Sequence, residues 1–141
     1  MRPLFCAGGV LGVFLMAGLV AATAGSSSDE ETPTIKKVMQ TLHKGKTSPL
    51  TTVKTALKGE SPDWTKVQKE AKVFATYGAA LPKNDPPRGD KASFEKLAKA
   101  YASSAESLDS SAKKEDLKGS RDAINKISTS CTACHKDHRP N

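Results

Sequence analysis

Two cysteines and a histidine stand close together near the C-terminus, in the sequence Cys131-Thr132-Ala133-Cys134-His135. This Cys-x-x-Cys-His spacing is the signature of covalent haem attachment, in which two thiols add to the vinyl groups of haem and the adjacent imidazole coordinates the iron. On a helix, positions 131, 134 and 135 lie on one face. The motif therefore predicts one covalently bound haem c, with Cys131 and Cys134 as thioethers and His135 as the proximal iron ligand.

Three other chemistries use a pair of cysteines at this spacing. A structural zinc site needs four ligands, and the sequence after residue 24 contains no second cysteine pair. A thioredoxin-like redox pair follows a strand and begins a helix, whereas Cys131 and Cys134 end a predicted helix. A plain disulfide between them, or two inert thiols, is the remaining alternative.

The first 24 residues have the layout of a secretory signal peptide. Arg2 precedes an apolar run from Leu4 to Ala22, and Ala22-Thr23-Ala24 supplies the small residues that precede a cleavage site. We predict cleavage after Ala24, which makes residues 25–32 a flexible N-terminus and the protein periplasmic or secreted. Attachment of c-type haem takes place in the same compartments. The alternative is an uncleaved membrane anchor, because the run is near the ~20 residues that a membrane helix needs.

The composition leaves few large side chains to fill a core. Only 5% of the 141 residues are aromatic, although 37% are hydrophobic. Because the macrocycle of haem would supply the missing apolar bulk, we expect the chain without haem to be molten or unfolded. The formal charge of +7, lowered by one if Arg2 is removed, comes from dispersed lysines. This pattern argues against nucleic-acid binding and favours acidic protein partners.

Apolar residues recur at helical spacing in four stretches, and no stretch has the alternation of a strand. The first stretch begins with Thr32 as N-cap and Pro33 at the first helical position. It continues beyond Pro49, which predicts a kink or a short break near residues 46–49. The second stretch opens at Ser61, with Pro62 at its first position, and stops before Pro82.

The second half of the chain contains the other two predicted helices. Residues 82–90 hold three prolines and one glycine, which predicts a loop. The third helix follows, with Asp90 as its cap. The fourth begins near Lys114, includes the Cys-x-x-Cys-His motif and ends at Pro140.

Four helices joined by short connections predict an all-α antiparallel four-helix bundle over residues 33–141. The first and last helices then lie side by side and run in opposite directions. Met39, about five residues into the first helix, comes to nearly the same depth as His135, about four residues from the end of the last. We therefore predict Met39 as the distal iron ligand. His43, one turn deeper, is one alternative, and a five-coordinate iron is the other.

The motif and the helix pattern together resemble the class II cytochromes c, the family of cytochrome c-prime and its low-spin Met/His relatives. The matching features, over about residues 33–139, are the Cys-x-x-Cys-His motif on the last helix with Arg139 four residues beyond its histidine, the Ser48-Pro49 break, Leu57-Lys58-Gly59, the helix from Asp63 to Ala80 with Leu81-Pro82 after it, and Ala92-Ser93-Phe94. The resemblance implies a four-helix bundle, often dimeric, that acts in periplasmic electron transfer or binds small gases.

The resemblance also implies roles for cationic residues. It places Arg139 near the haem edge. In that family an arginine early in the first helix lies near the haem propionates. This sequence has Lys36 and Lys37 at the comparable positions. Because a lysine can also pair with a propionate, the resemblance implies the same role for these lysines. His138, three residues after His135, is expected to be exposed.

These observations predict an electron carrier and not an enzyme. A thioether ligand from Met39 gives low-spin iron with little reorganisation on reduction, which suits one-electron transfer. The alternative is a five-coordinate protein like cytochrome c-prime that binds NO or CO. A peroxidase is disfavoured, because the sequence offers no evident distal His–Arg pair. The expected partners are redox proteins with acidic docking surfaces and a second copy of the chain, with membrane contact only if the signal segment is retained.

Overall fold

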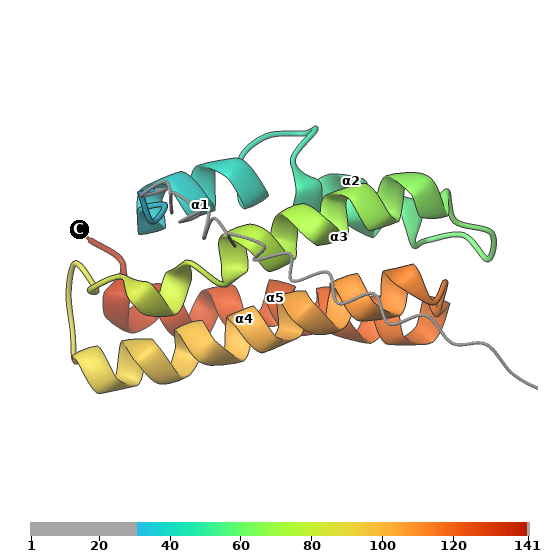
Figure 1. Cartoon of the computed structure of the whole chain (residues 1–141). Coiled ribbons are helices and arrows are strands. Elements are labelled where there is room, and N and C mark those ends of the chain that lie inside the picture. The colour runs from blue at the N-terminus through green and yellow to red at the C-terminus, as the bar shows by residue number, and fades with distance from the viewer. Residues whose placement is uncertain (1–30, 141) are drawn as a thin grey trace, which may run out of the picture. The chain divides into compact units, whose positions relative to one another are not determined.

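The computed structural model describes residues 31–140, so the predicted signal peptide and residues 25–30 of the predicted N-terminus lie outside the described part. In chain order the elements are α1 (Ile35–His43), α2 (Pro49–Ala56), α3 (Trp64–Gly78), the 3-10 helix η1 (Leu81–Lys83), α4 (Lys91–Lys113) and α5 (Leu117–His138) (Figure 1). Residues 31–140 are therefore all-helical and contain no strand, which confirms the all-α part of the prediction. None of these helices is both long enough and apolar enough to be a candidate membrane span.

Helices α1 and α2 are the two halves of the first predicted stretch. The chain between them includes Gly45, whose φ of 97° lies in the left-handed region that glycine adopts without strain. Ser48 caps α2 by accepting a hydrogen bond from the backbone N–H of Thr51, and Pro49 occupies the first helical turn. The predicted break near residues 46–49 is confirmed.

Two of the predicted helix starts are wrong by two residues. Thr34, and not Thr32, caps α1, because its hydroxyl accepts a hydrogen bond from the backbone N–H of Lys37 at 3.3 Å. Asp63, and not Ser61, caps α3 by accepting from the backbone N–H of Lys66 at 3.1 Å. A carboxylate is favoured at this end of the helix dipole. In both cases the proline precedes the cap and lies outside the helix.

The prediction for the second half of the chain needs smaller corrections. Asp90 caps α4 as predicted and accepts from the backbone N–H of Ser93 at 2.7 Å. Pro82 and Lys83 belong to η1, so only residues 84–90 form the predicted loop. Helix α5 begins at Leu117, after a turn in which Glu115 has a φ of 55°, and not near Lys114.

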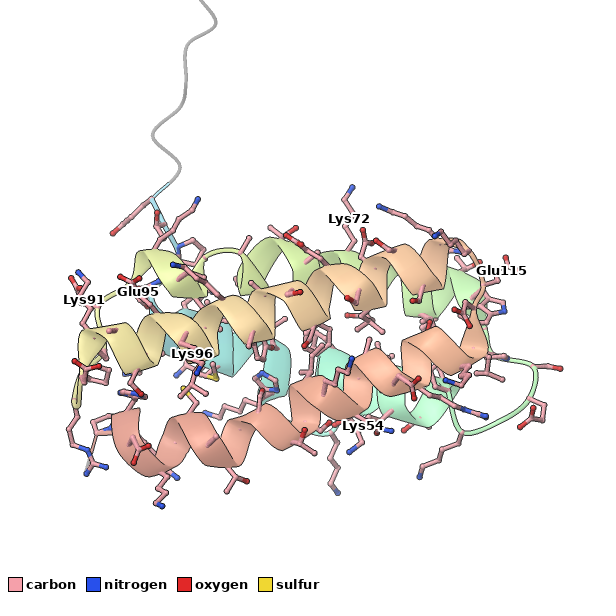
Figure 2. All side chains as sticks on the ribbon, turned by 90° about the horizontal axis from the view of Figure 1, so that it is seen from below. Lys54, Lys72, Lys91, Glu95, Lys96 and Glu115 are labelled. Atoms are coloured by element: carbon pink, nitrogen blue, oxygen red, sulfur yellow. The ribbon has the colours of Figure 1, made fainter. Side chains whose placement is uncertain are left out.

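Helix α4 is the centre of the packing, with α3 along one side and α5 along the other (Figure 1). Helix α2 packs against α3 and α5, while α1 packs against α2 and α3. Small residues let the helices approach closely: a Cβ atom added to Gly78 of α3 would lie 3.0 Å from the Cβ of Ala105 on α4. Large side chains such as Phe74, Leu42 and Leu108 fill the remaining space. Charged side chains such as Lys72 and Glu115 point outward (Figure 2).

Candidate functional site

A cavity of about 790 Å³ is lined by residues of α1 and of the C-terminal end of α5, among others. In Figure 1 the start of α1 and the end of α5 lie at the same end of the structure. The cavity volume falls within the roughly 300–1,000 Å³ of most small-molecule and cofactor sites. Helices α1, α4 and α5, together with η1 and the loop after it, contribute its walls. The lining residues are Thr34, Ile35, Lys36, Met39, His43, Leu81, Asn84, Asp85, Pro87, Phe94, Leu97, Ala98, Tyr101, Ser130, Cys131, Cys134, His135, His138, Arg139 and Pro140.

The residues predicted to hold haem all line this one cavity. They are Lys36, Met39, His43, Cys131, Cys134, His135 and Arg139. Lys37, the second lysine considered for a propionate, is exposed and is not among the lining residues. The fold thus brings the start of α1 to the end of α5, although the two segments are far apart in the sequence.

Cys131 and Cys134 are half-buried and form no disulfide. The Cys131 thiol donates a hydrogen bond to the carbonyl oxygen of Ile127 at 3.6 Å, one turn earlier on α5. Burial raises the pKa of both thiols; for Cys134 the neighbouring Cys131 raises it further. Lys54 of α2, which lies beside α5 in Figure 2, opposes this effect at Cys131. Both groups are therefore neutral thiols at the cavity wall, and His135 next to them is exposed.

His43 lies in the cavity wall, where its side chain contacts Tyr101 and Phe74. Its Nε2 atom lies 2.9 Å from the Tyr101 hydroxyl oxygen, and its ring meets the rings of Phe74 and Tyr101 edge-on, each at 6.0 Å between centroids. Its Nδ1 atom is buried and has no hydrogen-bond partner among the described residues. Burial, with a smaller contribution from His135, lowers the pKa of His43, and burial raises the pKa of Tyr101. The pair is therefore neutral.

Met39 lies one turn before His43 on α1. Its side chain is half-buried, packs against the core and also lines the cavity. Unlike the nitrogen atoms of His43, the sulfur of a methionine needs no hydrogen-bond partner, since a thioether is only a weak acceptor. Met39 is thus the lining residue of α1 that offers an uncommitted soft donor atom.

His138 is buried, and the expectation that it is exposed is wrong. Only 3% of its surface is accessible. Its Nδ1 atom lies 2.9 Å from the carbonyl oxygen of Arg88 and its Nε2 atom 3.3 Å from the hydroxyl of Ser93. Its ring meets Phe94 edge-on at 5.5 Å between centroids. The loop after η1 and the start of α4 enclose it, a tertiary contact that no local sequence pattern signals.

Several lining residues received no site prediction from the sequence. Phe94, Leu97 and Tyr101 recur at helical spacing along α4, and that spacing could have indicated that they flank the cofactor. Asn84, Asp85 and Pro87 lie in the loop, where hydrophobic periodicity carries no information. They contribute to the cavity because the loop folds back over it.

The chemistry of the lining fits haem. Two thiols and an imidazole come from one helix end, a thioether comes from the facing helix, and aromatic and aliphatic side chains cover much of the remaining wall. Asp85 is paired with Lys91 at 2.6 Å, so Lys36 and Arg139 give the lining an excess of positive charge that suits two carboxylates. Within residues 31–140, no group of three or more His, Cys, Asp or Glu side chains is arranged to hold a metal ion by itself.

Comparison with known proteins gives one match. Residues 89–139, which span the residue before the cap of α4 through the C-terminal end of α5 and include the Cys-x-x-Cys-His motif, match the family described as Cytochrome C'. No curated protein and no solved structure matches the chain.

Proposed function

This chain is cytochrome c-prime-like over residues 89–139, and from that premise we propose that it is a monohaem c-type cytochrome that carries one electron at a time. The observation that supports this proposal best is the convergence of Met39, Cys131, Cys134 and His135 on one cavity. Electron transfer needs a redox centre held at a fixed position, and ligands from two helices that line the same cavity would supply it. We place this centre on an antiparallel four-helix bundle in which α1 and α2 act as one interrupted helix.

Cys131 and Cys134 would hold haem by adding their S–H groups across its two vinyl groups, which forms two C–S bonds and needs no oxidant. His135 is the proposed proximal ligand. When bound, haem supplies an iron centre that accepts and releases one electron. Both thiols are half-buried at the end of α5, and this burial raises their pKa values so that they stay neutral at the cavity wall. The apolar lining limits the access of water to the centre, which tunes its potential.

Met39 is the proposed distal ligand. His43 is less suited to that role, because Nε2 is bonded to Tyr101 and Nδ1 is buried, so ligation would require loss of the Tyr101 bond or rotation of the ring. Met39 needs no such rearrangement, since it already lines the cavity as an uncommitted thioether. Lys36 and Arg139 are the proposed partners of the two haem propionates.

The cellular setting follows from the same proposal. The predicted cleavage after Ala24 would release the protein into the periplasm or the medium, where haem c is attached. The positive charge of the chain suits redox partners with acidic docking surfaces, and a second copy of the chain is a further proposed partner.

A gas-binding protein is the second proposed function. Phe94, Leu97 and Ala98 give the cavity an apolar wall that could surround NO or CO on five-coordinate iron. The two functions differ in one atom, the Met39 sulfur: bound to iron it favours electron transfer, and unbound it leaves a position for gas.

Covalent attachment is tested by expressing the full chain in a host that exports and matures c-type cytochromes and weighing the intact protein after denaturation. We expect the mass of the chain from Gly25 onward plus one haem. The Cys131→Ala, Cys134→Ala double variant should carry no covalent haem. A wild-type protein with no added mass would contradict the proposal, and the same spectrum reports whether cleavage follows Ala24.

A further inference from the structure

The C-terminal turn of α5, which carries His135, is fastened to the loop at residues 84–90. In Figure 1 the connection between η1 and α4 lies at the same end of the structure as the red end of α5. A helix leaves the carbonyl groups of its last turn without helical partners. In α5 the backbone N–H of Arg139 satisfies the carbonyl of His135, and the loop supplies contacts to the carbonyls of Lys136 and Asp137.

Arg88 supplies two of these contacts from outside the helix. Its Nη2 atom donates to the carbonyl oxygen of Lys136 at 2.7 Å, and its Nε atom donates to that of Asp137 at 3.2 Å. A cation at the C-terminal end of a helix is also favoured by the helix dipole. The planar guanidinium presents its Nε–H and Nη2–H groups in a fixed fork that reaches both carbonyl groups at once, a rigid geometry that a lysine ammonium lacks.

His138 makes the return contact from the helix to the loop. Because a carbonyl oxygen only accepts, the Nδ1–H of His138 donates to the Arg88 carbonyl at 2.9 Å. The side chain of Arg88 thus binds the backbone of α5, and a side chain of α5 binds the backbone of Arg88. Since His138 is 3% exposed, loss of its contact would leave a buried polar group without a partner.

Gly89 lets the two segments come this close. A Cβ atom on Gly89 would lie 2.8 Å from both the Asp137 carbonyl oxygen and the Nδ1 atom of His138, and its φ is 82°. A side chain here would force the loop away from the end of α5. The other end of the loop is fixed as well, because Asn84 donates from Nδ2 to the carbonyl oxygens of Pro33 and Ala80 at 3.1 and 2.8 Å.

We propose that Arg88 and His138 are positioning residues, which form a latch that holds the last turn of α5, and with it His135, against the wall of the cavity. The inference rests on the proposed function for the role of His135 as iron ligand. The latch fixes the backbone from which the imidazole extends, while Asn84, Asp85 and Pro87 of the same loop line the cavity. The loop wall and the ligand-bearing turn therefore move as one unit.

The test measures amide hydrogen exchange at residues 135–139 in the purified protein, expressed from the full chain. It compares the wild type with Gly89→Ala and Arg88→Ala, and Gly45→Ala is the matched control. Gly45 has a φ of 97° but no atom within 4 Å of an added Cβ, so it reproduces the backbone strain of Gly89→Ala without the crowding. We expect Gly89→Ala and Arg88→Ala to exchange about ten-fold faster at these amides, the loss of roughly one net hydrogen bond. Gly45→Ala should leave these amides unchanged.

A spectroscopic measurement separates positioning from simple stability. In the ferric protein, Arg88→Ala should broaden the electron paramagnetic resonance signal of the iron. Arg88→Lys, which keeps the charge, should bring the line width part of the way back to that of the wild type. Unchanged exchange in Arg88→Ala, or equal acceleration in Gly45→Ala and Gly89→Ala, would overturn the latch. If the purified wild-type product is folded but carries no haem, the proposed function is contradicted, while faster exchange in Gly89→Ala than in Gly45→Ala would still support the latch.

Discussion

The Nε2 atom of His43 lies 2.9 Å from the hydroxyl oxygen of Tyr101, in the wall of the cavity that Met39 and His135 also line. This bond joins α1 to α4 and occupies one of the two ring nitrogens. Since the other nitrogen is buried, the histidine on α1 is held in a structural role. The methionine one turn earlier lines the same cavity and carries the uncommitted donor atom that we propose as the distal ligand.

Replacing Met39 separates the two proposed functions. Met39→Ala should convert the ferric iron from low-spin to high-spin and allow the ferrous protein to bind CO, because it removes the proposed sixth ligand. Absorption and electron paramagnetic resonance spectra provide the measurement. Leu97→Ala is the control, since it enlarges the same cavity without removing a donor atom and should stay low-spin. An unchanged spectrum in Met39→Ala would move the ligand assignment to His43.

Replacing Tyr101 tests the structural role of His43. Tyr101→Phe leaves the buried imidazole without its partner, so we expect a loss of about 1–3 kcal/mol in the free energy of unfolding. Urea denaturation measures it. Tyr77→Phe is the control, because Tyr77 is half-buried and its hydroxyl makes no hydrogen bond within residues 31–140, so its loss should change stability little. Equal effects of the two substitutions would argue against the His43–Tyr101 bond.

The pKa of His43 makes stability depend on pH. Burial lowers this pKa below its ordinary value of 6.5, so the unfolded chain takes up a proton at a higher pH than the folded protein does. The free energy of unfolding should therefore fall as the pH drops below 6.5 and continue to fall until the folded protein is also protonated. Urea denaturation above and below this pH tests it. His43→Gln, which cannot take up the proton, should lose less stability, and an identical pH dependence would contradict the prediction.

Ser120 offers a substitution that should not destabilise the protein. Its side chain is completely buried in α5, and its hydroxyl has no hydrogen-bond partner in the described part of the chain. Ser120→Ala removes this buried group, so thermal unfolding should show equal or greater stability. In Ser128→Ala, by contrast, the lost hydroxyl donates to the Ile124 carbonyl at 2.8 Å, and stability should be the same or lower. A marked destabilisation by Ser120→Ala would indicate a partner for its hydroxyl.

The sequence predicted the helical class, the break before Pro49 and seven of the residues that line the cavity. These features depend on local signals: apolar spacing, a proline after a serine, and a cysteine pair beside a histidine. The burial of His138 and the contribution of Arg88 could not be predicted in this way. Both depend on how the loop at 84–90 folds over the end of α5, a contact between residues 49 and 50 positions apart in the sequence.

The N-cap residues of α1 and α3 also could not be predicted from the sequence. At Thr32-Pro33-Thr34 and Ser61-Pro62-Asp63, two possible caps flank one proline, and proline is compatible with either choice. The cap is selected by which side chain reaches the free amide groups of the first turn, and this geometry exists only once the chain has folded.

The ferric spectrum of the purified wild-type protein tests the proposed Met39–iron–His135 arrangement most directly. A low-spin electron paramagnetic resonance signal, together with a sulfur-to-iron charge-transfer band that disappears in Met39→Ala, is the predicted result. A high-spin spectrum in the wild type would contradict methionine ligation and one-electron transfer through it, and would identify the cavity as a gas-binding site instead.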